Sequence, residues 1–458
     1  MKIDTRIRAL DLAPAVERVW KASGPKILTI ERRYDPAAGA PVFTAGGRYT
    51  SRGWTDWTRG FQYGSALLQF DATGDRRFLE IGRRGTLERM APHLTDMGVH
   101  DHGFNNVSTY GTLWRLAGER RFRASPWEKR FYELALACSG AVQAHRWTAL
   151  GGGEGYIYSF NGPHSLFVDT IRSLRSLAIA HRLGQVLVEE DGTRVSLLAR
   201  LVTHALTTVK HLVVTGQGRD VYAVRGRVTH EAIFNTKSGT FRCPGTQQGY
   251  SPFTTWTRGQ AWAILGLAEM LEFLRTVPGA ELGPLGGRRR IEQALTRAAR
   301  AAADHYIAHS ALDGIPYWDA GAPGLAALGD ITSQPADPLN GVEPVDSSAA
   351  AISAQGLLRL GRCLEGRRSP AAARYRQAGL TLARTLMDEP YLSSSPRHEG
   401  LLLHAVYHRP NGWDAVPPGQ AIPSGEACLW GDYHLRELAL YLQRIVRGMP
   451  YLTFWGAA

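Results

Sequence analysis

Apolar residues recur every three to four positions along most of this 458-residue chain, which is the spacing of one face of an α-helix. Residues typical of helix ends flank several of these stretches. Ser125, Pro126 and Glu128 form an N-terminal capping motif, and Gly74 follows another stretch at the point where its helix would end. The pattern predicts twelve helices, over residues 11–22, 59–73, 76–91, 106–118, 126–145, 165–184, 192–213, 256–276, 288–309, 347–364, 370–388 and 430–447.

The loops between these helices are unequal in length. Long loops rich in Gly, Pro and aromatic residues follow alternate helices, and long loops in a compact domain usually carry function. Six helical hairpins closed into an inner and an outer ring would gather these loops around one mouth. The pattern therefore predicts an all-α (α/α)6 barrel in a single domain, residues 1–458, with short loop hairpins at 221–224 and 401–404. The alternative is an open solenoid, which the absence of a fixed-length repeat disfavours.

Charge and cysteine content narrow the function classes. Lysine and arginine number 53 against 41 acidic residues, a net charge of +12, spread through the predicted helices. This pattern is typical of a solvated arginine-rich surface, and it also suits attraction to an acidic ligand. There is no basic stripe interleaved with aromatics, so we expect no nucleic-acid partner. The four cysteines lack paired spacing, so neither a zinc site nor a disulfide framework is predicted.

The chain shows no signal-peptide pattern and no apolar stretch of the roughly 20 residues that span a bilayer. We therefore expect no membrane partner and a cytoplasmic location, with a periplasmic one possible if a leader was removed. As a partner we expect an acidic ligand, with the protein acting as a monomer or homodimer.

Two isolated aspartates are the first candidates for chemistry. Asp101 follows His100 just before a predicted helix, whose positive end would favour its ionised form; capping of backbone amides is the alternative role. Asp169 lies in an apolar stretch predicted as helix, where an ionised carboxylate is costly unless it is paired or protonated. Such a pair suits cleavage of a sugar, because one acid must hold a proton near neutral pH.

A motif with an arginine between tryptophans is the third candidate element. Arg258 and Trp262 are four residues apart and share one helical face, with Trp256 half a turn before. An arginine fork matches a carboxylate and indoles stack on sugar rings, so the motif suits an acidic sugar. The alternative places the tryptophans in the core and pairs Arg258 with a buried acid such as Asp169. No His and carboxylate spacing predicts a metal site.

Ordered motifs along the chain resemble those of the unsaturated glucuronyl hydrolases of glycoside hydrolase family 88. The matching motifs are Trp57-Thr58-Arg59-Gly60-Phe61, Ala72-Thr73-Gly74-Asp75, His100-Asp101-His102-Gly103-Phe104, Val168-Asp169-Thr170, Gln248-Gly249-Tyr250-Ser251, Trp256-Thr257-Arg258-Gly259-Gln260-Ala261-Trp262, Pro316-Tyr317-Trp318-Asp319, Asp346-Ser347-Ser348-Ala349-Ala350 and Trp430-Gly431-Asp432-Tyr433. The resemblance implies an (α/α)6 barrel without metal or organic cofactor. The resemblance implies two catalytic residues: Asp169 would be the general acid and base, and Asp101 would be the second essential carboxylate. The neighbouring charge of Asp101 would raise the pKa of Asp169. The uronate subsite would be lined by Trp57, or Trp54 in another register, and by His100, His230, Gln248, Trp256, Arg258 and Trp262.

The reaction that the resemblance implies is hydration of a 4,5 double bond. An enzyme of this kind removes the unsaturated uronic acid from the non-reducing end of oligosaccharides made by polysaccharide lyases. Two alternatives stay open: a conventional inverting hydrolase acting on saturated uronides, and an acidic-sugar-binding barrel without turnover. Departures at Gln247, His102 and the polar run 105–109 bear on substrate choice, and the loop at 393–397 stands where some family members recognise sulfate.

Overall fold

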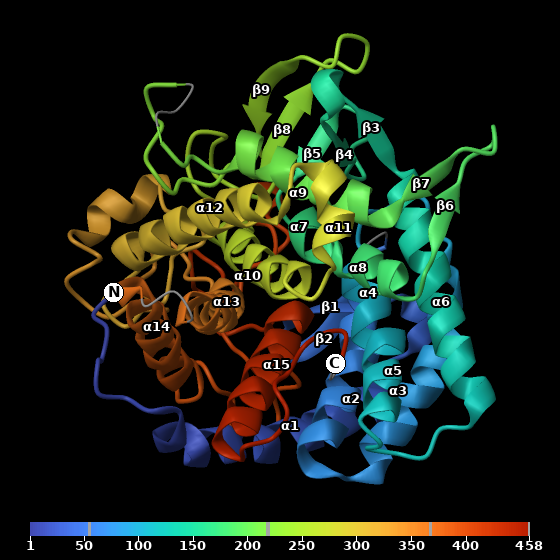
Figure 1. Ribbon diagram of the computed structural model, residues 1–458. Helices are drawn as coiled ribbons and strands as arrows, with labels where there is room; N and C mark the ends of the chain where they lie inside the picture. The colour runs from blue at the N-terminus through green and yellow to red at the C-terminus, as the bar shows by residue number, and fades with distance from the viewer. Residues whose placement is uncertain (54–55, 217–219, 366–368, 457–458) are drawn as a thin grey trace.

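The computed structural model describes residues 1–53, 56–216, 220–365 and 369–456. Its long helices form two rings (Figure 1). The inner ring contains α2 (Arg59–Thr73), α4 (His102–Asn106) continuing through the π-helical η5 (Val107–Gly111) into α5 (Thr112–Gly118), α7 (Thr170–Ser173) with α8 (Arg175–Arg182), α10 (Thr257–Leu274), α13 (Ser347–Glu365) and α15 (Leu429–Val446). The outer ring contains α1 (Ala13–Arg33), α3 (Arg76–Arg89), α6 (Pro126–His145), α9 (Leu197–Leu212), α12 (Arg288–His309) and α14 (Pro370–Leu386).

Contacts around the inner ring close it into a barrel. Each inner helix packs on the next, and α15 packs back on α2. The predicted (α/α)6 barrel is therefore confirmed, and the open solenoid is wrong because its two ends would not meet. The sequence distinguishes the rings: α10 is buried along nearly its whole length, whereas α12 buries only one face, as expected of a helix at the surface.

Two glycines allow inner helices to touch where they carry candidate site residues. A Cβ on Gly60 would lie 2.4 Å from the Cα of Asn105, and one on Gly103 would lie 2.3 Å from the carbonyl oxygen of Ser173. Any side chain at either position would push α2 or α7 away from α4. These glycines fix how closely the segments that carry the candidate residues approach one another.

Three helix predictions need correction. The predicted helix 192–213 begins only at Leu197, because Arg194–Ser196 form a strand that pairs with Val186–Val188. The first helix does not end at residue 22 but runs through Pro25 to Arg33, because Ile27 and Ile30 bury apolar surface beyond the proline. The stretch 165–184 is not one helix: Ser165–Phe167 form strand β5, and helix begins only at Thr170. Asp169 therefore precedes a helix and does not lie inside one.

The remaining short elements lie in the connections. Strands pair antiparallel as β1 (Pro41–Ala45) with β2 (Arg48–Ser51), β3 (Trp147–Ala149) with β4 (Gly155–Ile157), β6 (Val186–Val188) with β7 (Arg194–Ser196), and β5 with β8 (Glu231–Phe234) and β9 (Phe241–Gly245). Short helical turns are η1 (Ala9–Leu12), η2 (Pro36–Ala38), η3 (Asp56–Thr58), η4 (Ala91–Leu94), η6 (Gly151–Gly153), α11 (Gly279–Leu282), η7 (Gly283–Leu285), η8 (Pro323–Leu328) and η9 (Arg409–Asn411). The predicted hairpins are wrong: 221–224 form turns, and 401–404 contribute only isolated bridges.

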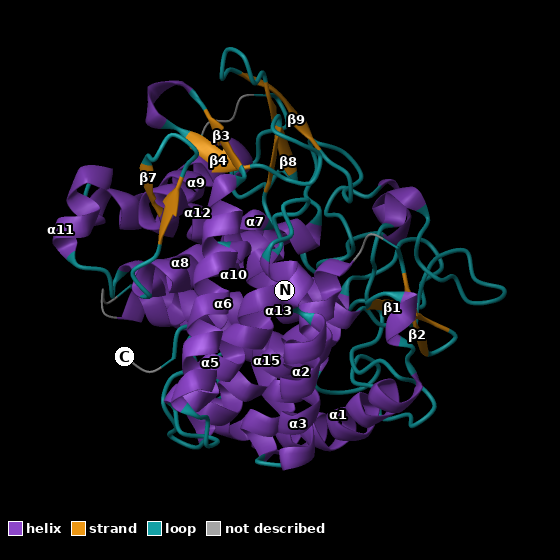
Figure 2. Ribbon diagram, turned by 90° about the vertical axis from the view of Figure 1, so that its right-hand side faces the viewer, coloured by secondary structure: helices purple, strands orange, loops and turns teal. Residues whose placement is uncertain are grey.

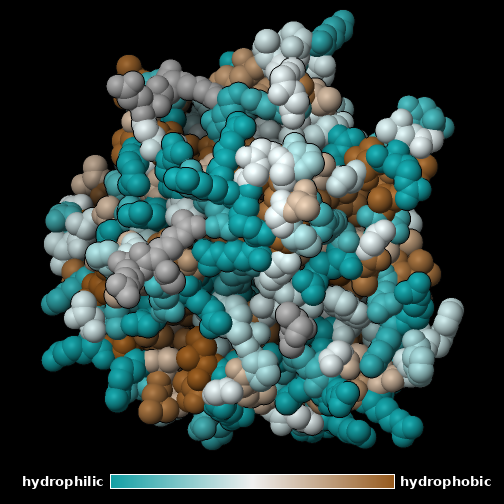
Figure 3. All heavy atoms as spheres, viewed as in Figure 1, coloured by the Kyte–Doolittle hydropathy of each residue, from teal (hydrophilic) through white to brown (hydrophobic). Residues whose placement is uncertain are grey.

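Two further sequence predictions concern a solvated, arginine-rich surface and the lack of a membrane-spanning helix. Polar and charged residues cover most of the face seen in Figure 3, as expected for the solvated arginine-rich surface. Strands and long loops run along the upper and right-hand edges of Figure 2. Among the described residues, we find no helix with the length and apolar character needed to cross a bilayer.

Candidate active site

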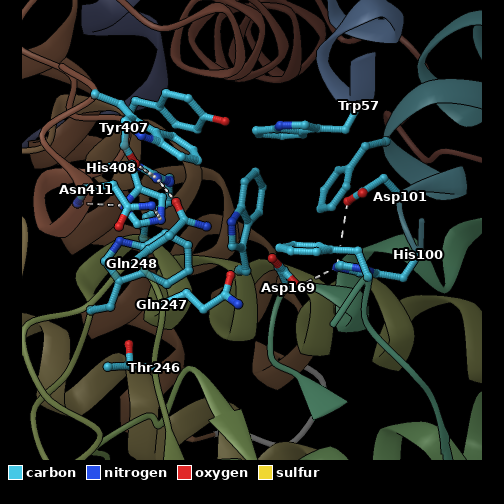
Figure 4. Close-up of a pocket in the computed structure, with 16 residues that line it drawn as sticks. Trp57, His100, Asp101, Asp169, Thr246, Gln247, Gln248, Tyr407, His408 and Asn411 are labelled. Atoms are coloured by element: carbon cyan, nitrogen blue, oxygen red, sulfur yellow. Dashed lines mark hydrogen bonds and ion pairs between the residues drawn. The ribbon is translucent and has the colours of Figure 1, made fainter. Parts of the chain in front are cut away.

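A pocket of about 600 Å³ opens among the loops that precede the inner helices (Figure 4). It is lined by Trp57, His100, Asp101, Phe104, Phe160, Asp169, Thr246, Gln247, Gln248, Trp256, Arg258, Trp262, Tyr407, His408, Asn411 and Trp413. Eight of the nine predicted site residues are in this set, and the exception is His230. The pocket thus brings together side chains from widely separated parts of the sequence.

The two aspartates face the pocket from the starts of two inner helices. Asp101 is the residue before α4 and Asp169 is the residue before α7. His100 lies between them: its Nε2 atom is 3.1 Å from Asp169 Oδ1 and 3.8 Å from Asp101 Oδ1. The Asp101 side chain accepts no hydrogen bond from the amides of the described helix α4, so capping does not explain it.

The electrostatics of Asp101, His100 and Asp169, called the triad below, differ from the sequence prediction. Burial, joined by repulsion from Asp169, raises the pKa of Asp101 to about 6 against the attraction of His100. Burial also acts to raise the pKa of Asp169, but the charge and hydrogen bond of His100 outweigh it and leave that pKa lowered. Burial acts to lower the pKa of His100, and the two carboxylates outweigh it. The sequence-based prediction that Asp169 has the raised pKa was wrong, because it did not include His100 between the two acids. Asp101 is the more readily protonated aspartate.

His230 lies behind the pocket wall. It is buried against Trp256, with the ring centroids 4.6 Å apart, and its Nδ1 atom accepts a hydrogen bond of 3.1 Å from the Gln247 amide. Burial lowers the pKa of His230 to about 4, so the ring is neutral near pH 7 and its hydrogen is on Nε2. This ring supports the Gln247-Gln248 segment that forms part of the wall, and its place in the uronate subsite stays a prediction.

Arg258 is a buried ion-pair partner within the wall. Its guanidinium donates to Asp346 Oδ2 at 2.9 Å and to Gln248 Oε1 at 2.6 Å. A buried pairing was the alternative reading of this arginine, although the acid is Asp346 and not Asp169.

Indole rings form much of the pocket wall. Trp57 is half-buried and stacks on Trp430, with the ring centroids 5.0 Å apart and the planes at 27°. Trp256 and Trp262 are almost fully buried and reach the pocket with part of their surface. Trp54, the other register considered for Trp57, lies outside the described residues. Flat apolar walls with a few polar groups are typical of a sugar site.

Comparisons with known proteins agree with this geometry. No family model matches the chain. Over 406 residues, it is 26% identical to an unsaturated glucuronyl hydrolase of Bacillus sp. (strain GL1), covering 87% of this chain and 89% of the relative. It is also 24% identical over 390 residues to an unsaturated chondroitin disaccharide hydrolase of Streptococcus pyogenes serotype M1, covering 84% of this chain and 81% of the relative.

The chain is a homologue of the unsaturated glucuronyl hydrolases. The crystal structure of the Bacillus sp. GL1 unsaturated glucuronyl hydrolase matches it with a TM-score of 0.70 at 23% identity, covering 96% of this chain and 99% of that one. A solved unsaturated glucuronyl hydrolase specific for heparin matches with a TM-score of 0.71 at 19% identity, covering 97% and 100%. These structural matches show the shared barrel fold.

Several lining residues of this unsaturated glucuronyl hydrolase homologue escaped the sequence analysis. They are Phe160, Tyr407, His408, Asn411 and Trp413. Four of them fall within seven residues of the long loop 389–429, where aromatic and polar residues alternate around Pro410 and Gly412. The local density of aromatic and polar residues could have marked this segment as part of the site.

Two of the three departures from the family pattern, His102 and the polar run 105–109, have structural explanations away from the pocket, whereas Gln247 lines it. Asn105 Oδ1 accepts a hydrogen bond from the Gly60 amide, and Asn106 donates to Ser139 Oγ, so this polar run belongs to a buried network. His102 joins the same network through Ser139. The loop 393–397 does not line the site; Lys26 holds it through Ser393 Oγ at 3.1 Å.

No cluster of three or more potential metal ligands occurs among the residues with described positions.

Proposed function

We propose that this protein is a glycoside hydrolase that removes an unsaturated uronic acid from the non-reducing end of oligosaccharides by hydrating the 4,5 double bond. The single observation that carries this proposal is the His100 bridge between Asp101 and Asp169, which faces a pocket with indole walls. A pair of acids with opposite pKa shifts in one cleft is typical of proton-transfer catalysis. The homology to enzymes with these names supports the same function.

The spacing of the acids bears on the inverting alternative. Asp101 Oδ1 and Asp169 Oδ1 lie 3.8 Å and 3.1 Å from the same nitrogen, so these two oxygens are separated by at most the sum of those distances, about 6.9 Å. Inverting hydrolases acting on saturated sugars hold their carboxyl groups about 6.5–9.5 Å apart to admit a water molecule. Most of the separations that this limit allows lie below that range, so the spacing disfavours the inverting hydrolase.

The proposed reaction adds one molecule of water to the substrate. Protonated Asp169 gives its proton to carbon 4, and the positive charge develops at carbon 5, where the ring oxygen stabilises it. The resulting Asp169 carboxylate takes a proton from water as the water oxygen bonds to carbon 5. The product is a hemiketal, which opens and releases the next sugar. A carboxylate at Asp101 would stabilise the cationic transition state.

Proton supply to Asp169 follows from the triad. His100 Nε2 lies within hydrogen-bonding distance of Asp169 Oδ1, so a proton can pass along this contact. The carboxylate of a bound uronate adds a negative charge beside the triad and so raises the pKa of both aspartates. Substrate binding thereby moves Asp169 toward the protonated form that the first step needs.

The decisive experiment follows the ultraviolet absorbance of the conjugated uronate. We expect the purified protein to bleach this band on unsaturated uronyl disaccharides and to leave saturated uronides intact. Release of glucuronic acid from a saturated uronide without bleaching would instead identify the inverting hydrolase. Binding of either ligand without turnover would identify a binding protein.

We expect kcat/KM to fall as pH rises through about 6. Transfer needs a carboxyl proton in the triad in addition to the proton that His100 holds through its raised pKa, and Asp101, whose pKa burial raises to about 6, is protonated below that value and ionised above it. The measurement is kcat/KM between pH 4.5 and 8 at constant ionic strength. Asp101→Asn should remove this fall of kcat/KM with pH and leave a low activity that does not depend on pH. A constant wild-type kcat/KM between pH 5 and 8 would exclude the triad as proton source.

The partners and location follow from the same proposal. An acidic oligosaccharide is the ligand, and the net charge of +12 favours its approach. We further propose action in the cytoplasm, or in the periplasm after removal of a leader, as a monomer or homodimer without nucleic-acid or membrane partners.

A further inference from the structure

The start of α4 is capped by a residue of another helix. Gly103 is the second residue of α4, so its amide is one of those that find no partner within the helix. The residue just before a helix commonly accepts this bond through its side chain, and here that residue is Asp101. The Gly103 amide instead donates to Ser173 Oγ on α7, at 2.9 Å. Since Ser173 serves as the cap, the Asp101 carboxylate is left to face the pocket (Figure 4).

The same serine also holds the residue on the other side of Asp101. Its hydroxyl donates to the His100 carbonyl oxygen at 2.6 Å. Ser173 is thus bonded to residues 100 and 103, and the backbone of Asp101 is fixed between them. Asp101 has φ −92° and ψ 17°, and not the extended conformation that is typical of a capping residue. Its backbone would have to change before its carboxylate could cap α4.

Gln143 decides where the Ser173 hydroxyl points. A serine oxygen accepts two hydrogen bonds and donates one. The Gly103 amide and Gln143 Nε2, each 2.9 Å away, occupy both acceptor positions, so the hydroxyl hydrogen points to the His100 carbonyl. Gln143 Nε2 gives its other hydrogen to the same carbonyl at 2.8 Å, and its Oε1 atom accepts from Ser176. Ser173 and Gln143 are both fully buried, so protein groups alone set this arrangement.

Ser173 lies one helical turn after Asp169. The segment that carries Asp169, whose Oδ1 atom is 3.1 Å from His100 Nε2, therefore also carries the hydroxyl that holds the His100 carbonyl. As a result, α7 carries one aspartate of the triad and, through Ser173, fixes the backbone of the other.

We propose that Ser173 is a positioning residue that keeps the Asp101 carboxylate in the triad by capping α4 in its place, with Gln143 orienting the serine hydroxyl. This proposal rests on the proposed function for the chemical role of the triad. Without the Ser173 oxygen, the buried Gly103 amide has no acceptor, which is costly. The Asp101 carboxylate replaces that oxygen once its backbone becomes extended, and it then leaves His100.

Ser173→Ala should lower kcat by roughly 10- to 100-fold with little change in KM, because the sugar still binds while the triad is displaced. The pH dependence should change as well. A carboxylate that accepts an amide hydrogen bond ionises more readily, so the pKa of Asp101 should fall. The midpoint of the fall in kcat/KM should therefore move from about pH 6 to lower pH, by about one unit. An unchanged midpoint would make Ser173 a purely structural residue and overturn the proposal.

The variant leaves in place the charged groups with the largest effect on the Asp101 carboxyl. They are His100 and Asp169 in the triad, Arg146 directly after α6 and Asp96 in the loop before α4. A shifted midpoint thus reports a new position of the Asp101 carboxylate and not the loss of a neighbouring charge.

A second variant, Ser173→Cys, keeps a side chain of similar size but offers only a weak acceptor. Its midpoint should move in the same direction by a smaller amount, and an unchanged midpoint would again contradict the proposal. The matched control is Ser23→Ala, which removes another fully buried hydroxyl, one that accepts from Arg436 Nε at 2.8 Å between α1 and α15. The control should keep the wild-type kcat and midpoint.

A crystal structure of Ser173→Ala tests the placement of Asp101 without turnover. One Asp101 carboxylate oxygen should lie within about 3 Å of the Gly103 nitrogen. A carboxylate that stays beside His100 would show that Ser173 does not place it. If the wild type fails to bleach the ultraviolet band, the proposed function is contradicted, and this structure still decides whether Ser173 positions Asp101.

Discussion

Purified Asp169→Asn protein should bleach the ultraviolet band of an unsaturated disaccharide roughly 100- to 10,000-fold more slowly than the wild type, the range expected for loss of a general acid and base. Asparagine matches aspartate in shape and can still accept from His100 Nε2, which lies 3.1 Å from Asp169 Oδ1. It cannot carry a proton to carbon 4 or take one from water. The measurement is kcat from initial rates of bleaching, and KM should change far less.

The matched control is Asp191→Asn, an exposed aspartate that accepts from the Thr193 amide. This variant should retain wild-type kcat. If Asp169→Asn also bleaches the band at the wild-type rate, the proton passes through another group, and Asp101 becomes the candidate acid. Its pKa of about 6 makes that outcome chemically reasonable.

The barrel could be predicted because its helices carry their own signals. Apolar period, capping residues and terminal glycines act locally, and a closed ring follows from counting alternating short and long connections. Local signals failed where distant contacts decide the structure. Ser165–Phe167 look helical in isolation but pair with β8, some 65 residues later, and Pro25 stays inside α1 because Ile27 and Ile30 find apolar neighbours.

The candidate site shows the same division between local and distant information. Motif resemblance found the acids and most of the lining, since each motif is short and continuous. The pKa order of Asp101 and Asp169 depends on His100 bridging two helices, which no single motif contains. Likewise, the role of Arg258 became evident only with Asp346, 88 residues away, in contact with it.

A buried ionic cluster beneath the pocket carries the second large expected effect. Arg172 on α7 donates to Glu269 on α10 at 3.1 Å and to Glu437 on α15 at 2.6 Å, and also contacts His434. Arg172→Met should lower the free energy of unfolding by about 3–5 kcal/mol, because it leaves buried carboxylates underpaired. Arg175, 4.0 Å and 3.8 Å from the same two acids, compensates only in part. Urea unfolding at pH 7 measures the loss.

The loss should depend on pH in a defined direction. In the wild type, Arg172, His434 and Arg175 outweigh burial and hold the pKa of Glu437 at about 2, so its pairing stabilises the fold above the usual glutamate pKa and is lost as pH falls toward 2. Without Arg172 the acid can protonate at milder pH, so the deficit should be smaller at pH 4.5 than at pH 7. The exposed control Arg384→Met, which removes a surface pair with Asp4, should cost under about 1 kcal/mol. Equal losses in the two variants would show that the cluster adds no more than a surface pair.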